Sequence, residues 1–453
     1  MSTDKAKPRL LLKDPDLPML LSMFIPIFCD MILNNLLGAI QNYFVAGAGE
    51  NALSAISLAG QVNQLICIVF FAAISATIVV VSQLRGIGHE RRAKLVVGQT
   101  MGFSVMGTAV IAVVFYLFPA EIMQLFFGKM APEIIVHSNT YIKLLGISLP
   151  FYCIFQVGCC SSRGFDNHKF PLYISVSGSV VNLILSFVLI KVLNLGILGA
   201  GISLIASRVF SAAISLFILI RNKWIVSFRK CVLLRFKVLK SVLYLGVFSS
   251  IQTIIVTYAQ TVKTSFLAGL PATHLNASSV YNAVGGLLAV PISVISTMIT
   301  TLVAKNISKG DMDATKKYIK KCLIYCFAIT AVIYIVAYFV LPAWVFPAYT
   351  KSAETIELAN GILLISVICT PTLSVLVNIF ANAFNGAGDA KFSTIVSVAC
   401  MLIFNLGLGY IFTVTLGWGI IGSTLSAHVS SLAKIIIYFF RYKSGKWVKH
   451  VLI

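Results

Sequence analysis

Residues 171–204 read PLYISVSGSVVNLILSFVLIKVLNLGILGAGISL, and residues 393–426 read STIVSVACMLIFNLGLGYIFTVTLGWGIIGSTLS. The two stretches align along their apolar runs and at their glycines. Asn182 falls on Asn405 and Gly196 falls on Gly419, each 223 residues further along the chain. A match that extends along both stretches indicates an internal repeat.

The repeat continues upstream of these stretches. SQLRGIGHERRAK, residues 82–94, lines up with AKNISKGDMDATK, residues 304–316, at an offset of 222. At the same offset, RGFDNHKF, which starts at Arg163, lines up with NGAGDAKF, which starts at Asn385. The chain is therefore expected to contain two copies of one six-helix unit.

The composition is that of an integral membrane protein. The 453 residues are 58% hydrophobic and 11% charged, with a mean hydropathy of +0.95, whereas soluble domains carry roughly a quarter charged residues. Apolar runs long enough to cross a bilayer predict an all-α fold with twelve transmembrane helices, arranged as two six-helix repeats around a central cavity.

The expected spans are 17–45, 52–82, 93–118, 134–162, 170–193, 197–220, 241–267, 275–303, 319–342, 356–384, 392–414 and 419–440. Pro150 and Pro371 are expected to break their helices at nearly equivalent points.

The basic residues predict the topology. Most of the 35 Lys and Arg residues fall in segments on one side, and the expected loops of the other side hold only Lys129, Lys191 and Lys351. By the positive-inside rule, the protein is a multi-pass cell-membrane protein with both termini in the cytoplasm. The net charge of +21 is thus explained by topology and lipid contact, and no nucleic-acid partner is expected. The predicted parts are an N-terminal tail (1–16), an N-terminal lobe (17–220), a basic linker (221–240), a C-terminal lobe (241–440) and a C-terminal tail (441–453).

One acid lies deep in an expected span. Counting about 1.5 Å per residue from Leu17 places Asp30 about 20 Å into the membrane, whereas the other acids lie in tails, loops or near helix ends. Burial favours the neutral form of a carboxyl, so Asp30 is expected to take up a proton near neutral pH. Asn34 and Gln41 follow it on the same helical face, whereas Asn35 points elsewhere. A structural hydrogen-bond network is the alternative role for Asp30.

The sequence resembles the multidrug and toxic compound extrusion (MATE) family over residues 17–449. The resemblance is carried by six segments: IPIFCDMILNNLLGAIQNYFVAGAGENALSAI, VVVSQLRGIGHERRAK, SSRGFDNHKFP, NLILSFVLI, GILGAGISLIASR and the final RYKSGKW. It implies an exporter that exchanges a substrate for H⁺ or Na⁺ by alternating access. Coupling of this kind needs a group whose ligand or charge differs between the two facing states.

The chain departs from the family at two positions. Many members carry an acid where this chain has Gln41, and some carry another four residues after the asparagine that matches Asn182, where this chain has Ser186. Their replacement places Na⁺ coupling through several acids in doubt. Asp30, Asn34, Gln41, Asn182 and Ser186 are our candidates for the ion-coupling site. For Asn182 and Ser186, plain helix packing is an equal alternative.

A cation is predicted within the seventh span. Lys263, with Gln260 beside it, corresponds to Gln41 at the repeat offset of 222. Because a charge within a helix is costly, Lys263 is expected to face the substrate cavity, as a ligand for an anionic group or as the counter-ion of Asp30. Snorkelling to the outer interface is the alternative. Arg208 and Lys143 occupy positions where family members often have basic residues, so structural roles are assigned to them first.

These observations favour a cation-coupled multidrug efflux antiporter, with H⁺ favoured over Na⁺ as the coupling ion. A flippase for a lipid-linked oligosaccharide, of a related superfamily, is the second hypothesis, and a cationic cavity would support it. The third, a membrane enzyme, lacks a catalytic motif and a nucleotide-binding loop in the sequence. We expect a small-molecule substrate, membrane lipid as surroundings, a monomer, and no metal or cofactor beyond the coupling ion.

Overall fold

The computed structural model describes residues 16–46, 50–127, 132–225 and 235–448, which form helices joined by short turns. Twelve helical segments within these ranges are long and apolar enough to cross a membrane. This finding confirms the predicted all-α fold with twelve spans. Parts of the predicted tails and of the basic linker lie outside the described residues, and so does the side chain of Gln41.

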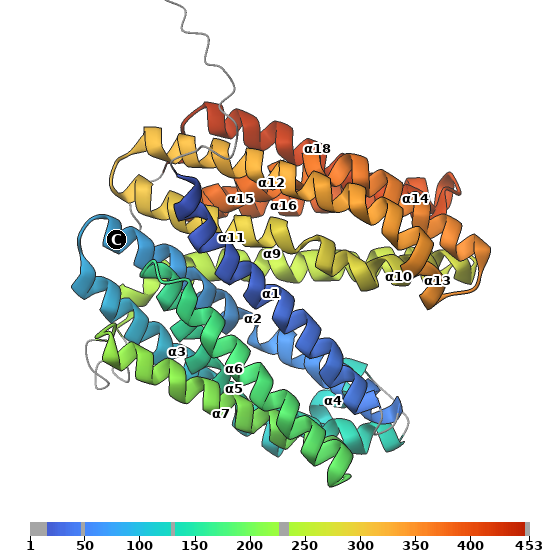
Figure 1. Cartoon of the computed structure of the whole chain (residues 1–453), viewed down its shortest axis with the longest axis horizontal. Helices are drawn as coiled ribbons and strands as arrows, with labels where there is room; N and C mark the ends of the chain where they lie inside the picture. The colour runs from blue at the N-terminus through green and yellow to red at the C-terminus, as the bar shows by residue number, and fades with distance from the viewer. Residues whose placement is uncertain (1–15, 47–49, 128–131, 226–234, 449–453) are drawn as a thin grey trace, which may run out of the picture.

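The first half of the chain, which we name the N-lobe, is drawn in blue to green in Figure 1. Its helices are α1 (Leu17–Ala46), α2 (Glu50–Gly86), α3 (Glu90–Leu117), α4 (Pro119–Phe127), α5 (Pro132–Gly164), α6 (Lys169–Ser186) and α7 (Gly196–Arg221), with a π-helical extension of α6 over Phe187–Val192.

The second half, the C-lobe, is drawn in yellow to red. Its helices are α9 (Phe236–Ala268), α10 (Ala272–Leu288), α11 (Val290–Ser308), α12 (Met312–Val340), α13 (Phe346–Tyr349), α14 (Ala353–Cys369), α15 (Val375–Gly386), α16 (Ala390–Cys400), α17 (Leu408–Tyr410) and α18 (Gly419–Lys443). Between them lie π-helical turns at Leu341–Val345, Thr370–Ser374, Met401–Gly407 and Ile411–Thr415.

Prolines explain where the observed helices differ from the expected spans. The span expected at 275–303 is divided into α10 and α11 at Ala289, next to Pro291, which has no N–H to donate to the preceding turn. Pro371 lies in a π-helical turn between α14 and α15. The expected break at Pro150 is wrong, because α5 continues through this residue.

The repeat is visible in the packing of two glycines. Gly164 ends α5 and packs against α2, where an added Cβ would lie 3.5 Å from the carbonyl oxygen of Ile78. Gly386 ends α15 and packs against α11, where an added Cβ would lie 2.6 Å from the carbonyl oxygen of Thr300. Both pairs follow the repeat offset, so the two lobes use the same close helix contact.

The lobes pack together at one end only. We call this the closed end; it carries the turns after α2, α5, α11 and α15, and the lobes diverge toward the opposite, open end (Figure 1). Toward the open end, one buried apolar cluster belongs to the N-lobe alone and another to the C-lobe alone. Toward the closed end, both clusters mix the lobes: Leu20 and Ile27 of α1 pack with α11, α12 and α15, and Leu245 of α9 packs with N-lobe helices.

Polar contacts add to this closure. The Gln83 side chain at the end of α2 donates from Nε2 to the carbonyl oxygen of Gly386, 3.0 Å away in the other lobe. Asp166, in the turn between α5 and α6, accepts from Lys305 Nζ of α11 at 2.6 Å and from Arg85 Nη1 at 2.9 Å. The closed end therefore combines an apolar core with an ion pair between the lobes.

Gly386→Ala is expected to destabilise the protein by about 1–3 kcal/mol, because its Cβ would collide with backbone that has little room to move. The measurement is the apparent melting temperature of the full-length protein in detergent. Gly286→Ala in α10 is the matched control, since its Cβ meets no atom within 4 Å, and it should leave the melting temperature unchanged or raise it. Equal melting temperatures for both variants would contradict this packing argument.

Candidate functional site

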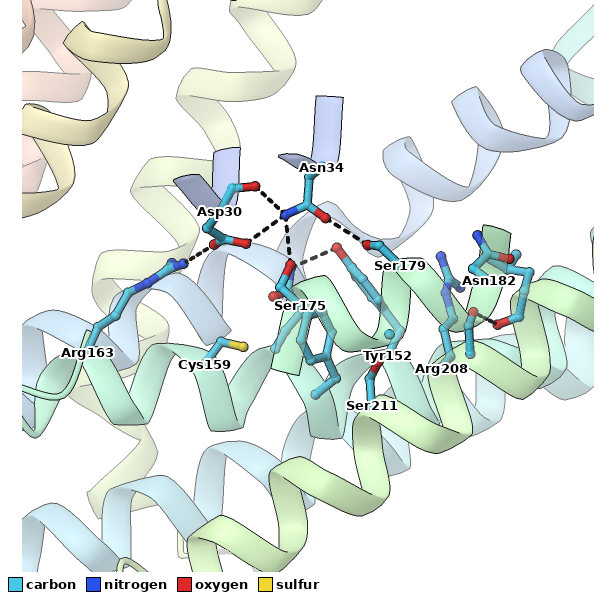
Figure 2. Close-up of a pocket in the computed structure, with 15 residues that line it drawn as sticks. Asp30, Asn34, Tyr152, Cys159, Arg163, Ser175, Ser179, Asn182, Arg208 and Ser211 are labelled. Atoms are coloured by element: carbon cyan, nitrogen blue, oxygen red, sulfur yellow. Dashed lines mark hydrogen bonds and ion pairs between the residues drawn. The ribbon is translucent and has the colours of Figure 1, made fainter. Parts of the chain in front are cut away.

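A polar cavity of about 450 Å³ lies within the N-lobe, between α1, α5, α6 and α7. Figure 2 shows side chains from these helices converging on it. Its lining is mainly hydroxyl, amide and charged groups, in contrast to the apolar clusters around it: Asp30, Asn34, Tyr152, Phe155, Gln156, Cys159, Arg163, Ser175, Gly178, Ser179, Asn182, Leu204, Ser207, Arg208 and Ser211.

Asp30 is paired with a cation at the edge of this cavity. Its side chain projects from the middle of α1 and is 7% exposed. Arg163, in the last turn of α5, donates from Nη2 to Asp30 Oδ2 at 3.0 Å, and Asn34 donates from Nδ2 to Asp30 Oδ1 at 2.7 Å. Each carboxylate oxygen therefore accepts a hydrogen bond, which offsets the cost of burying the charge.

Asn34 connects α1 to α6 through two serines. Its Nδ2 lies 2.7 Å from Ser175 Oγ, in addition to its contact with Asp30. Ser179 Oγ, one turn further along α6, donates to Asn34 Oδ1 at 3.0 Å. Because both ends of the amide are engaged, the rotation of α1 against α6 is fixed at the level of the carboxylate (Figure 2).

A second cation lines the same cavity. Arg208 of α7 donates from Nη1 to Ser148 Oγ at 2.6 Å, and its Cζ lies 4.5 Å from the ring centroid of Tyr152, a cation–π contact. The Tyr152 hydroxyl in turn accepts a hydrogen bond from Gln156 Nε2 at 2.7 Å. The structural role expected for Arg208 is present, but this residue also contributes charge to the cavity.

The other candidates for the ion-coupling site differ in whether they reach the N-lobe cavity. Asn182 lines the cavity. Ser186 is fully buried one turn further on, where its Oγ lies 2.8 Å from Ser203 Oγ of α7 and 3.5 Å from Asn182 Oδ1. Ser186 therefore lies behind the cavity lining. The side chain of Gln41 lies outside the described part of the chain.

A second cavity, of about 310 Å³, lies between the lobes. We call it the central cavity; α5 separates it from the N-lobe cavity, because Gln156 and Arg163 line both. Among its described lining residues, Arg163 alone is charged. The rest are small, apolar or neutral polar residues: Ser75, Ala76, Ile78, Val79, Cys160, Leu245, Ser249, Thr297, Thr300, Asn382, Asn385 and Ala390.

Lys263 does not line either cavity. Its side chain is buried within the C-lobe, and Nζ donates to the carbonyl oxygen of Ser423 in α18 at 2.9 Å. The proposed pairing of Lys263 with Asp30 is wrong, because Arg163 occupies that place. Gln260 is exposed on α9 and lies eleven residues beyond Ser249, on the same helical face, but it also falls outside both cavity linings.

Three residues that contact Asp30 or Asn34 were missed in the sequence. Ser175 and Ser179 form a stripe with Asn182 at helical spacing, a pattern that was visible in the sequence. Arg163 falls in a turn expected on the inner side and was used to align the repeat, but no role in the site was assigned to it. No local pattern connects it with Asp30, which lies 133 residues earlier.

The family model named MatE matches this chain twice, over residues 26–188 and 249–411. The chain belongs to the MATE family of multidrug efflux transporters. The two matched segments begin 223 residues apart, so the family match and the internal repeat identify the same two units.

Related proteins agree with this assignment. The uncharacterized transporter YisQ of Bacillus subtilis is 22% identical over 438 residues, 95% of each chain. The probable multidrug resistance protein YoeA of the same species is 26% identical over 345 residues, 73% of each chain. Among solved structures, a mutant of the Vibrio cholerae MATE transporter VcmN has a TM-score of 0.87 at 17% identity and covers 96% of this chain and 98% of its own. The last comparison establishes the likeness in fold.

In this MATE chain, Lys263→Met is expected to leave the substrate charge preference unchanged, to within about twofold, and to leave stability unchanged or raised. Methionine has a similar length, and replacing a buried cation by an apolar side chain removes its desolvation cost. The measurement is export of a cationic and an anionic substrate by the variant in vesicles, with its melting temperature. If the variant reverses the preference between the cationic and the anionic substrate, Lys263 contacts the substrate and this prediction is wrong.

Proposed function

We propose that this MATE-family protein is a proton-coupled multidrug efflux antiporter that works by alternating access, with Asp30 as the coupling group. The observation that carries the proposal is the position of Asp30: it is the single acid among the described residues that line the two cavities. Asp30 lies within a membrane-spanning helix, and a proton on its carboxyl would remove the charge there, so proton uptake can bias a conformational equilibrium.

The contacts of Asp30 favour H⁺ over Na⁺. A metal cation needs several oxygen ligands, but both carboxylate oxygens of Asp30 already face donors, Arg163 and Asn34. A proton needs no such ligand set, and it weakens the pairing with Arg163 directly.

Closing one end of the bundle while opening the other gives the two conformations that alternating access requires. The basic residues predict that the closed end faces the cytoplasm, so the described state is outward-facing, with both termini inside the cell. The return to an inward-facing state has to break the contacts of Asp166 with Lys305 and of Gln83 with Gly386. A small-molecule substrate would enter the central cavity, and a single chain supplies both lobes, which supports a monomer.

The alternative functions have weaker support. A flippase for a lipid-linked pyrophosphate calls for several cations in the central cavity, but Lys263 and Arg208 are not among its lining residues. Arg163 is the remaining cation there, and Asp30 neutralises it in this state. For a membrane enzyme, the two cavities supply no nucleophile with a base at hydrogen-bond distance among the described residues.

Asp30→Asn is expected to lower the rate of proton-driven export by at least about tenfold. The amide keeps the size of the side chain, but it cannot change its charge. The measurement is substrate transport into inverted vesicles under an imposed pH gradient, with the amount of folded protein determined in parallel. Asp313→Asn is the matched control, because this acid is exposed in the first turn of α12. If Asp30→Asn retains export with an unchanged pH dependence, Asp30 is not the coupling group.

A further inference from the structure

An apolar groove of about 370 Å³, which we call the α12 groove, lies on the C-lobe between α12 and the junction of α14 with α15. These helices are labelled in Figure 1. The groove is lined by Leu323, Ile324, Phe327, Pro371, Thr372, Val375 and Leu376, and none of these described residues lines the two polar cavities. Ile324 is 42% exposed and Phe327 is 47% exposed, within the membrane span Met312–Tyr349. The α12 groove therefore opens toward the hydrocarbon of the bilayer.

The groove lies where a proline interrupts a helix. Pro371 has no N–H to donate, and a π-helical turn over Thr370–Ser374 joins α14 to α15. Thr372 is exposed on this turn, but its Oγ1 donates to the carbonyl oxygens of Ile368 at 3.3 Å and Cys369 at 3.1 Å. Because its hydroxyl is already engaged, the wall of the groove offers an occupant apolar contacts.

Two exposed lysines continue the same face of α12 toward the closed end. Lys316 lies seven residues before Leu323. Lys320 lies seven residues before Phe327, so each lysine is two helical turns from a groove residue on its own face. Asp313, in the first turn of α12, forms no ion pair with either lysine in the described part of the chain. The face thus changes from cationic to apolar along the helix.

The neighbouring lysines of α12 differ, because the protein itself neutralises them. Lys317 and Lys321 both pair with Asp16 at the start of α1, with Lys317 Nζ at 2.7 Å from Asp16 Oδ2. The two exposed lysines have no such partner among the described residues. Their positive charges remain for an anion outside the protein.

We propose that Lys316, Lys320 and the α12 groove form a binding site for one anionic phospholipid of the cytoplasmic leaflet. The two lysines bind its phosphate, and one of its acyl chains lies in the groove. Basic residues at the cytoplasmic surface attract anionic lipids, and a groove with apolar walls accepts a hydrocarbon chain without leaving a polar group unpaired. The site goes beyond the proposed function and does not depend on the coupling group.

The spacing along α12 fits a phospholipid. At about 1.5 Å per residue, Phe327 lies about 10 Å beyond Lys320 and about 16 Å beyond Lys316. Half of the hydrocarbon core is about 15 Å thick, so a lipid with its phosphate at the lysines extends its chain past the groove within one leaflet. The lysine side chains reach the head-group level while their methylenes lie along the helix. The predicted topology places this end of α12 in the cytoplasmic leaflet.

The first repeat does not reproduce this combination. At the offset of 222, Lys320 corresponds to Gly98, and Lys316 corresponds to Lys94, which pairs with an acid of its own helix at 4.0 Å. The helix that corresponds to α14 and α15 is α5, which continues through Pro150. Cations at the closed end of the N-lobe therefore serve as controls for the site on the C-lobe.

A tryptophan in the groove tests the proposal. Phe327→Trp is made in the full-length protein and reconstituted in phosphatidylcholine nanodiscs with a rising fraction of phosphatidylglycerol whose acyl chains carry bromine, which quenches tryptophan fluorescence. The signal of the four native tryptophans is subtracted by measuring the wild type in the same way. Half-maximal quenching should need an at least about fivefold lower fraction of this lipid than of phosphatidylcholine brominated on the same chains.

Three variants serve as comparisons. Combining Lys316→Gln with Lys320→Gln should bring the two lipids to within about twofold of each other. Arg91→Gln with Arg92→Gln is the matched control, because these arginines are exposed at the start of α3 at the same end of the bundle and their loss removes the same charge. It should leave the preference unchanged. Phe339→Trp, 70% exposed in the last turn of α12, should be quenched equally by both lipids.

The proposal is overturned if both lipids quench Phe327→Trp at equal fractions, if Phe339→Trp shows the same preference, or if the preference survives the loss of both lysines. Ile324→Trp is a second reporter in the same groove and replaces Phe327→Trp if that variant lowers the melting temperature. All of these outcomes concern the lipid site alone. Proton-driven export that depends on Asp30 would stand in each case.

Discussion

The ion pair between Asp30 and Arg163 is the contact on which the arrangement of α1 depends. A carboxylate and a guanidinium within a bundle of apolar helices must neutralise each other, since either charge alone is costly there. The pair fixes α1 against α5, and Asn34 fixes it against α6. The first turns of α1, with Leu20 and Ile27, pack in the core of the C-lobe. One helix therefore connects the charged site of the N-lobe to the core of the other lobe.

The fold was largely predictable because it follows from two simple constraints. A bilayer requires long apolar helices, and a duplicated gene repeats their order, so hydropathy and self-comparison gave the twelve spans and the two units. Local departures were less predictable. The division at Ala289 next to Pro291 and the continuity of α5 through Pro150 show that a proline allows a break, while the surrounding packing decides whether one occurs.

The site was predictable only along one helix at a time. Asp30 and Asn34 are one turn apart, so their contact follows from helical geometry. Arg163 of α5 pairs with Asp30, and predicting this contact requires knowledge of how the helices pack. Lys263 was predicted to face the substrate cavity because of its charge and its position in the repeat. The repeat identifies Lys263 as the counterpart of Gln41. It does not show which side of α9 faces the cavity. Its partner is a carbonyl oxygen of α18, which a sequence does not reveal.

The two repeats share a backbone plan but divide the polar chemistry unequally. At the closed end, Gln83 and Lys305 are repeat-related and both reach across to the opposite lobe, one to a carbonyl oxygen and the other to the carboxylate of Asp166. At the offset of 222, Asp30 corresponds to Gln252 and Arg163 to Asn385, so the second repeat holds amides where the first holds an ion pair. Amides do not titrate near neutral pH. The two lobes thus share a backbone plan, while the ion pair between Asp30 and Arg163 has no counterpart at the repeat-related positions of the C-lobe.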